Sequence, residues 1–515
     1  MKFIQGTSRE QLALFPASLE AVIGSDNEVR VIDLFVDSLN LGALGFKTDF
    51  VENGRPGYHP SDLLKLFIYG YLNCIRSSRA LEKECTRNIE LMWLLKQLSP
   101  DHNTIANFRK EYTLAIKSVF RSTVTIAEHF KLIGGTLLAG DGTKLRAQNS
   151  KKNNFNAKKI ERHVVYIDNK IDEYTAALAQ ADGDDKTPLE KKIEKHHRHR
   201  KGYENLSKQL EESGEEQIST SDTESRQMII RGQITEVAYN VQTTVDAEHC
   251  LPIDYDLTNT NDSKALGDMV ERAAEIIGNT TFTALFDKGY HTASEIKRAQ
   301  QLSIHTLVAI PEVASHAPDT AYDLKEFYYE EKEDYYRCPE GQILLTNEQW
   351  YTKTHRNTKT LVKHYKTPFC EGCSAKALCT RNQNGRLIER SEYAHFVDQN
   401  RRNIEQNKEL YKRRQAIIEH VFGTLKRQWG FCHILTKKGK KAASGDVGFM
   451  FIAYNLKRLF SILGKNEFKT YLRQLVLEFL AYLNLINQIQ FDLSPPEIQL
   501  QFLHFKNAPH KTGCY

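Results

Sequence analysis

Residues 135–145 read GTLLAGDGTKL, and residues 281–290 read TFTALFDKGY. Each stretch runs from apolar, strand-forming residues into an aspartate, Asp141 or Asp287, which glycine follows directly or after one residue. We predict that each stretch is a buried strand that ends at its aspartate.

Working outward from these two stretches, the hydrophobic pattern alternates between strands and helices. Three hairpin-like strands come first, and helices and strands alternate after them, which predicts an α/β fold with a mixed sheet flanked by helices. The predicted order is strand 136–139, strand 236–247, strand 252–260, helix 265–277, strand 283–286, helix 294–301 and strand 305–311.

The segment before this sheet is predicted to be helical, and so is an insertion within it. Short helices with basic tips in the first 130 residues fit either a compact DNA-binding module or a plain helical bundle. Two apolar stripes, Ile160 to Leu178 and Leu189 to Leu210, predict a helical hairpin. The nearby histidines fit either a metal site or a polar helix face: His196, His197 and His199.

The remaining chain divides by composition. A polar, irregular segment with four of the nine cysteines follows the predicted sheet, and helical patterns return after it. The predicted domains are a helical domain over 1–130, the first part of the core over 131–310 with its insertion at about 150–225, a cysteine-containing insertion over 311–402, and helices over 403–515.

Composition places the chain among ordinary globular proteins of two or three domains. Of its 515 residues 40% are hydrophobic and 26% are charged, and the net charge is only +5. Positive charge is nonetheless concentrated between Arg401 and Lys441, with twelve Lys or Arg against three Glu, which suits a polyanion or a solvated helix face.

The same composition argues against secretion and membrane insertion. Nine scattered cysteines do not indicate a disulfide framework, and the first residues lack the apolar run of a signal peptide. No run of about 18 apolar residues predicts a membrane span. We expect a soluble, cytoplasmic protein.

The acidic residues suggest chemistry. Carboxylates at the ends of neighbouring strands can converge, because strands lie about 4.8 Å apart, and converging carboxylates repel unless a cation lies between them. Their hard oxygen atoms favour Mg²⁺ or Mn²⁺. A third candidate, Glu419, lies in the amphipathic stretch YKRRQAIIEHVFGTLKRQWGF, where a salt bridge with Arg414 or Lys426 is its structural alternative. An aspartate at a strand end can equally cap a turn.

Three such carboxylates can hold two divalent ions roughly 3.5–4 Å apart. In such a site one ion activates the attacking oxygen and the other stabilises the leaving oxygen, so that the protein supplies mainly positioning and positive charge. Tyr411, Arg414 and Lys426 surround Glu419 in the sequence and can supply these contacts.

Four cysteines form a second candidate metal site. Cys370, Cys373 and Cys379 follow the spacing C-x2-C-x5-C, and Cys338 lies upstream in YRCPEG. Four thiolates in a polar segment with little core favour a structural Zn²⁺ ion, and unliganded thiols are the alternative.

At this point the sequence resembles a known family. GDGTK, DKGY and YKRRQAIIEHVFGTLKR are similar to the DDE transposases of bacterial insertion sequences, closest to the branch catalogued as IS eleven-eighty-two and related to the group with a Tyr-Arg-Glu-Lys signature. PGYHPSDLLKLFIYGYLNCIRSSRALEKECTRNIELMWL and AYNLKRL also resemble these transposases, so that the likeness covers most of the chain in order.

The resemblance implies an RNase H-like core with a catalytic triad of Asp141, Asp287 and Glu419 that binds two Mg²⁺ or Mn²⁺ ions. It implies action on transposon inverted repeats and target DNA, and a homodimer on DNA. The DNA-binding set carried over is Tyr411, Arg414, Lys426 and Arg427. Four residues separate Arg414 from Glu419 where the related group has three, so Arg414 or its neighbour Arg413 faces the DNA.

Two further functions remain open on the sequence alone. One is a DNA-binding relative without catalysis, which the intact acidic triad disfavours. The other is a different RNase H-like nuclease, which the additional N-terminal domain and the helical insertion disfavour.

Overall fold

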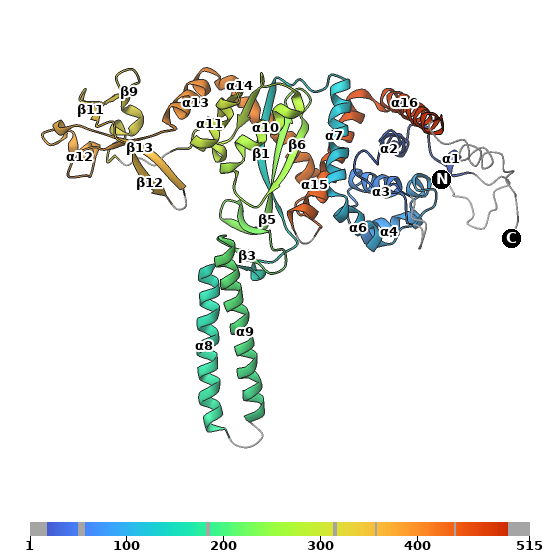
Figure 1. Cartoon of the computed structure of the whole chain (residues 1–515), viewed down its shortest axis with the longest axis horizontal. Helices are drawn as coiled ribbons and strands as arrows, with labels where there is room; N and C mark the ends of the chain where they lie inside the picture. The colour runs from blue at the N-terminus through green and yellow to red at the C-terminus, as the bar shows by residue number, and fades with distance from the viewer. Residues whose placement is uncertain are drawn as a thin grey trace, which may run out of the picture.

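The computed structural model describes residues 18–49, 57–181, 186–312, 317–355, 358–436 and 439–492. Its body combines a mixed sheet with packed helices (Figure 1). A helical hairpin projects from the middle of this body, and a small second sheet extends from the end opposite the N-terminal helices. The α/β class, the mixed sheet and the helical N-terminal region predicted from the sequence are confirmed.

The main sheet has six strands in the order β4-β5-β1-β7-β8, and β6 also pairs with β5. Strand β1 runs parallel to β7, which runs parallel to β8, and β5 runs antiparallel to β1, β4 and β6. The strands are β1 (Leu137–Arg146), β4 (Arg226–Arg231), β5 (Ile234–Asp246), β6 (Leu251–Thr258), β7 (Thr283–Phe286) and β8 (His305–Val308).

One strand boundary differs from the prediction. We expected the first strand to end at Asp141, but β1 continues to Arg146, and Asp141 lies in its middle, opposite Thr243 of β5. The continuous antiparallel ladder with β5 keeps this segment extended although glycine stands on both sides of the aspartate. Asp287, in contrast, directly follows the last residue of β7, as predicted.

Helices cover the sheet and join it to the N-terminal region. Residues of the sheet, of the N-terminal helices and of α15 belong to one continuous hydrophobic core. The N-terminal helices are α1 (Leu19–Val22), α2 (Glu28–Asp37), α3 (Pro60–Leu72), α4 (Ser78–Arg87), α5 (Ile89–Leu94), α6 (His102–Glu111) and α7 (Thr113–His129). The helices of the core are α10 (Leu266–Ile277), α11 (Ala293–Gln301), α13 (Ala394–Gln406), α14 (Lys408–Phe422), α15 (Lys440–Leu463) and α16 (Lys465–Asp492).

Helix starts follow local chemistry. Asp101 caps α6 by accepting hydrogen bonds from the amides of Asn103 and Thr104. In α3 the first helical position is Pro60, and the ring of His59 caps the helix by accepting a hydrogen bond from the amide of Ser61.

Helix α15 is almost entirely buried, since it packs against both α7 and β6. No single helix in the described ranges is long and apolar enough to cross a membrane. Helix α15 and the start of α16 together pass that test by length and composition, but the chain bends by 114° between them.

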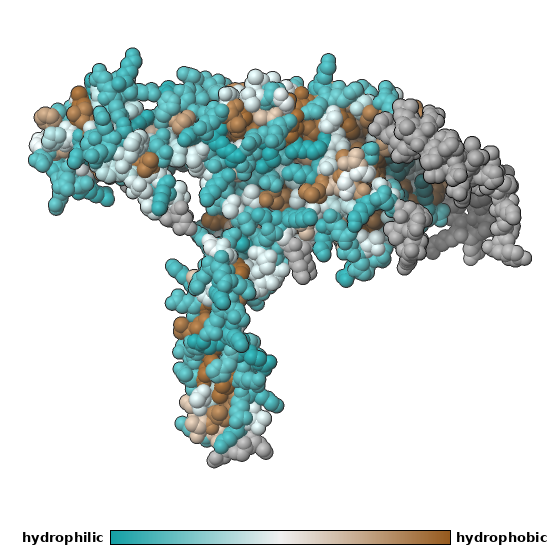
Figure 2. All heavy atoms as spheres, in the orientation of Figure 1, coloured by the Kyte–Doolittle hydropathy of each residue, from teal (hydrophilic) through white to brown (hydrophobic). Residues whose placement is uncertain are grey.

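The predicted helical hairpin is present as α8 (Ala157–Gln180) and α9 (Lys186–Ser213), and the turn predicted between them falls at 182–185, outside the described residues. A small core of Phe155, Ile160 and Leu210 holds the base of the hairpin, beside β2 (Asn154–Phe155) and β3 (Ile218–Ser219). Its visible face is largely hydrophilic (Figure 2).

The segment expected to be irregular, 311–402, instead contains a second six-stranded sheet in the order β12-β13-β11-β10-β9, with β14 on β13. A separate core of aromatic and aliphatic side chains lies on it: Phe327, Tyr336, Leu344, Tyr365 and Ile388. The strands are β9 (Tyr328–Glu330), β10 (Tyr335–Arg337), β11 (Ile343–Thr346), β12 (Tyr351–His355), β13 (Thr358–Lys366) and β14 (Ile388–Ser391), and α12 (Lys376–Cys379) lies beside them.

Candidate active site

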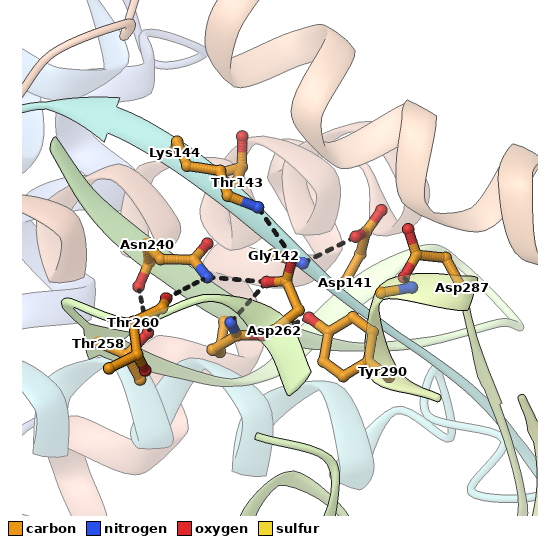
Figure 3. Close-up of polar contacts among 12 residues, drawn as sticks. Asp141, Gly142, Thr143, Lys144, Asn240, Thr258, Thr260, Asp262, Asp287 and Tyr290 are labelled. Atoms are coloured by element: carbon orange, nitrogen blue, oxygen red, sulfur yellow. Dashed lines mark hydrogen bonds and ion pairs between the residues drawn. The ribbon is translucent and has the colours of Figure 1, made fainter. Parts of the chain in front are cut away.

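Asp141 on β1 and Asp287, which directly follows the adjacent parallel strand β7, lie side by side (Figure 3). The register pairs Ala139 of β1 with Leu285 of β7, so each aspartate follows its paired residue by two positions. Each carboxylate accepts a hydrogen bond from the amide of a nearby glycine, Gly142 for Asp141 and Gly289 for Asp287, both at 2.8 Å. The two strands thus place both predicted aspartates at one position of the sheet.

The environment of Asp141 opposes its ionisation. Burial raises the pKa of its carboxyl group to about 6, and the negative charges of Asp287 and Asp262 add to that increase. The Arg414 guanidinium and the Gly142 amide act in the opposite direction without cancelling the effect. A carboxylate with a raised pKa beside a second carboxylate is the arrangement that a bound cation relieves.

Helix α14 supplies two of the predicted DNA-binding residues to this position. The Tyr411 hydroxyl donates to the carbonyl of Phe286, the residue before Asp287, at 3.1 Å. Arg414 forms an ion pair with Asp141 at 3.2 Å, and both side chains are largely buried, 18% and 22% exposed. Arg414 therefore reaches the aspartates, whereas its neighbour Arg413 is exposed.

The helix changes its winding immediately beyond α14. Residues Gly423–Gln428 form a π-helical turn, in which the Lys426 ammonium donates to the Thr143 hydroxyl on β1 at 3.0 Å. Burial lowers the pKa of Lys426, and the cations Lys144 and Arg427 contribute to the decrease. Arg427 itself is exposed, and within the described ranges neither a hydrogen bond nor an ion pair joins it to either aspartate.

Glu419 lies on the same helix but in a different setting. Its side chain is exposed and accepts a hydrogen bond from the Gln415 side chain at 2.9 Å. Within the described part of the chain, neither a hydrogen bond nor an ion pair joins Glu419 to the aspartates or to the two cations considered as alternatives, Arg414 and Lys426. The structure thus brings two of the three predicted carboxylates together and places the third on an exposed face of α14.

A third aspartate that the sequence reasoning missed lies beside the pair. Asp262 is held by Lys144, Asn240 and Gln242 (Figure 3), and the Tyr290 hydroxyl donates to Gln242. Burial opposes the ionisation of Asp262, but Lys144 and the two amides outweigh it and lower its pKa. The only signal in the sequence was Asn-Asp-Ser before a helix, which reads as an ordinary cap.

The donors at the aspartate pair are of the kind that Mg²⁺ and Mn²⁺ prefer, because they are carboxylate oxygens. The carboxylates of Asp141 and Asp287 fit such an ion. The Arg414 guanidinium beside Asp141 supplies positive charge at this position. Across the described ranges, however, no group of three or more His, Cys, Asp or Glu side chains is arranged to hold a metal ion. The three histidines of α9 likewise do not form such a group.

The four predicted zinc ligands gather at one place in the second sheet. Cys338, Cys370, Cys373 and Cys379 line the same small cavity. Burial raises the pKa of Cys379, and the three other thiols contribute to the increase while Arg386 opposes it. All eight cysteines in the described ranges are free thiols. The four side chains therefore lie near one another without forming a ligand set.

Comparison with known proteins finds two matching families. Residues 17–111 match the family described as "Transposase domain (DUF772)", and residues 337–460 match the family described as "Transposase DDE domain". No curated protein matches the chain. A solved structure titled as the piggyBac transposase synaptic complex with hairpin DNA is 8% identical, with a TM-score of 0.27, and the alignment covers 95% of this chain and 87% of that one.

Proposed function

We propose that the chain, which matches two transposase family domains, is a DDE-type transposase that cuts and joins DNA strands at a metal site built on Asp141 and Asp287. The observation that carries the proposal is the meeting of these carboxylates on adjacent parallel strands, with Arg414 and Lys426 beside them. Strand order supports an RNase H-like core, because three antiparallel strands, β6, β5 and β1, continue into the parallel strands β7 and β8.

In this proposal Asp141 and Asp287 hold Mg²⁺ or Mn²⁺, which when bound supplies a Lewis acid for the phosphate and an activated oxygen nucleophile. Arg414 and Lys426 would neutralise the scissile phosphate and hold it in line for displacement, and Tyr411 fixes α14 against the end of β7. Arg427, exposed at the next position, would contact the DNA backbone.

We keep Glu419 as the third carboxylate of the site. It lies on the helix that delivers Arg414, five residues further along, and its exposed side chain accepts a hydrogen bond from the side chain of Gln415. Glu419→Gln is expected to lower strand cleavage by at least about a hundredfold while DNA-end binding is unchanged, since a lost metal ligand acts on the reaction rather than on binding. Glu409→Gln, also exposed on α14, is the matched control. Normal cleavage by Glu419→Gln would remove Glu419 from the site.

The substrate would be double-stranded DNA that carries the transposon inverted repeats, together with target DNA. Joining both ends of one element requires two active sites, so we propose a homodimer on DNA. Cys338, Cys370, Cys373 and Cys379 would hold a structural Zn²⁺ ion in the second sheet, because their thiols already share one cavity.

The deciding experiment incubates the purified protein with Mg²⁺, a duplex carrying the inverted repeats that flank its coding sequence, and a target plasmid. Cleavage followed by joining of the cut 3′ end to the plasmid is the expected result. Cleavage without joining would instead indicate a nuclease with the same core. Binding without metal-dependent cleavage would indicate a catalytically silent DNA-binding protein.

A further inference from the structure

Asp262 occupies a position that neither the family domains nor the proposed catalytic set explains. It begins a short 3-10 turn, η3 (Asp262–Lys264), between β6 and α10, and its side chain is only 15% exposed. Three donors hold its carboxylate (Figure 3): Lys144 at 2.8 Å, Asn240 at 2.7 Å and Gln242 at 2.9 Å. The carboxylate is therefore fixed in place from β1 and from two positions on β5.

The same carboxylate fills the space beside the two glycines of the site. A Cβ atom on Gly142 would lie 2.2 Å from one oxygen of Asp262, and a Cβ atom on Gly289 would lie 3.5 Å from the other. Any larger residue at Gly142 would displace the carboxylate, since real Cβ contacts are never that short. Asp262 thus packs directly against the backbone of Gly142, whereas a Cβ atom on Gly289 would only come into ordinary van der Waals contact with it.

Each of these glycines holds one aspartate of the pair. The Gly142 amide donates to Asp141, and the Gly289 amide donates to Asp287. Asp262 is therefore connected to Asp141 through direct contact with Gly142, and to Asp287 through its proximity to the turn at Gly289. Groups that orient ligands in this way commonly change metal affinity by 10–100-fold when they are removed.

We propose that Asp262 is a positioning residue for the aspartate pair: clamped by Lys144, Asn240 and Gln242, it fixes the Gly142 and Gly289 backbones that orient Asp141 and Asp287 toward a divalent ion. The inference rests on the proposed function, because it takes this pair to be the metal site. Asp262 touches no reacting atom in this account, and it acts only through the two glycines and their amides.

The test measures metal binding without DNA or turnover. Mn²⁺ is titrated into the full-length protein, and the free ion is quantified by electron paramagnetic resonance. Asp262→Ala is expected to raise the Mn²⁺ dissociation constant about tenfold or more. Asp262→Asn, which keeps an oxygen for Asn240 and Gln242 but loses the ion pair with Lys144, should give an intermediate value and serves if the alanine variant does not fold.

Asp254→Ala is the matched control. Asp254 is 1% exposed on β6 and is paired with Arg121 and Arg272, so its loss should destabilise the fold at least as much, yet it touches neither glycine. Its Mn²⁺ dissociation constant is expected to equal that of the wild type. An equal shift in this control, or wild-type affinity in both Asp262 variants, would overturn the positioning role.

The two proposals fail in different ways. Wild-type protein that neither binds Mn²⁺ nor cuts DNA would overturn the metal site at Asp141 and Asp287, and the role of Asp262 with it. Wild-type protein that does both, together with Asp262 variants that bind Mn²⁺ normally, would overturn only the role of Asp262.

Discussion

At the scale of single residues, glycine explains how three aspartates come close together. A Cβ atom on Gly140 would lie 2.1 Å from the Phe286 ring, and one on Gly142 would strike Asp262. Because Gly140 has no side chain, Phe286 of β7 can pack against β1 at that position. Because Gly142 has none, the carboxylate of Asp262 can pack there. The sequence showed these glycines only as turn signals, because their packing depends on residues more than 100 positions away.

The raised pKa of Asp141 predicts a pH-dependent stability in the metal-free protein. Because the folded state binds the proton up to about pH 6 and the unfolded chain releases it near its ordinary pKa of 3.8, unfolding free energy falls as pH rises between these values. Asp141→Asn should therefore stabilise the protein near neutral pH, by at most about 3 kcal/mol, and have little effect near pH 4.

Urea unfolding in the presence of EDTA, at about pH 4 and about pH 7, measures this difference. The same change in unfolding free energy at both pH values would show that ionisation of Asp141 is not its cause. A loss of stability near neutral pH would contradict the assigned direction of the pKa shift.

At the scale of elements, a buried ionic network ties the N-terminal helices to α15. Asp446 on α15 is fully buried and pairs with Arg76 at 2.9 Å and Arg109 at 3.3 Å, and the Tyr71 hydroxyl also donates to it. The amide of Leu435, in the loop after the π-helical turn, donates to the same carboxylate at 2.7 Å. One aspartate thus joins the N-terminal helices to the segment that carries Lys426.

Asp446→Ala leaves two buried guanidinium groups without their counter-ion, so it should cost about 3–5 kcal/mol of unfolding free energy. Glu28→Ala is the matched control, because Glu28 pairs with Lys457 across the same pair of regions but at the surface, where such pairs contribute about 1 kcal/mol or less. Equal costs for the two variants in urea unfolding would contradict the importance of the buried network.

The cysteine cluster makes a prediction about the second sheet. If the four thiols hold zinc, the wild-type protein should contain about one Zn²⁺ ion per chain, and Cys373→Ser should lose most of it and unfold at a lower temperature. Cys74→Ser, at an exposed cysteine outside the cluster, should retain the metal. Elemental analysis that finds no zinc in the wild-type protein would refute this assignment.

The sequence predicted elements well where periodicity was strong. The order of β1, β5, β6, β7 and β8 and both long helices of the hairpin follow from apolar spacing, whereas β4 was not predicted. The meeting of Asp141 with Asp287 follows from strand adjacency. The sequence did not predict the strands within 311–402. These strands are short and bury single aromatic residues such as Tyr336 and Tyr365, so they give no repeated hydrophobic pattern. Asp262 was missed because its partner Lys144 is 118 residues away.

At the scale of the whole molecule, one core supports the body and two smaller cores support its extensions. The hairpin and the second sheet have their own hydrophobic clusters, separate from the one that unites the N-terminal helices with the main sheet. This separation predicts that the outer part of the hairpin contributes little to the stability of the body.

Removing residues 170–198 and joining the helices by a short glycine-rich turn tests that prediction. The deletion keeps the Asp168–Arg200 pair and the basal cluster around Phe155, so the melting temperature should change by no more than about 4 °C. Thermal unfolding followed by circular dichroism gives the value. Loss of cooperative unfolding would show that the hairpin is part of the main folding unit.

The most direct test of the metal-dependent chemistry is a cleavage assay in Mg²⁺ that compares Asp287→Ala with the wild type. Its substrate is a duplex that carries the inverted repeats. We predict that cleavage falls by at least about a thousandfold while DNA-end binding is unchanged, and that Asp268→Ala, at an exposed aspartate on α10, cuts normally. Cleavage by Asp287→Ala at the wild-type rate would contradict the assignment of this aspartate pair as the active site.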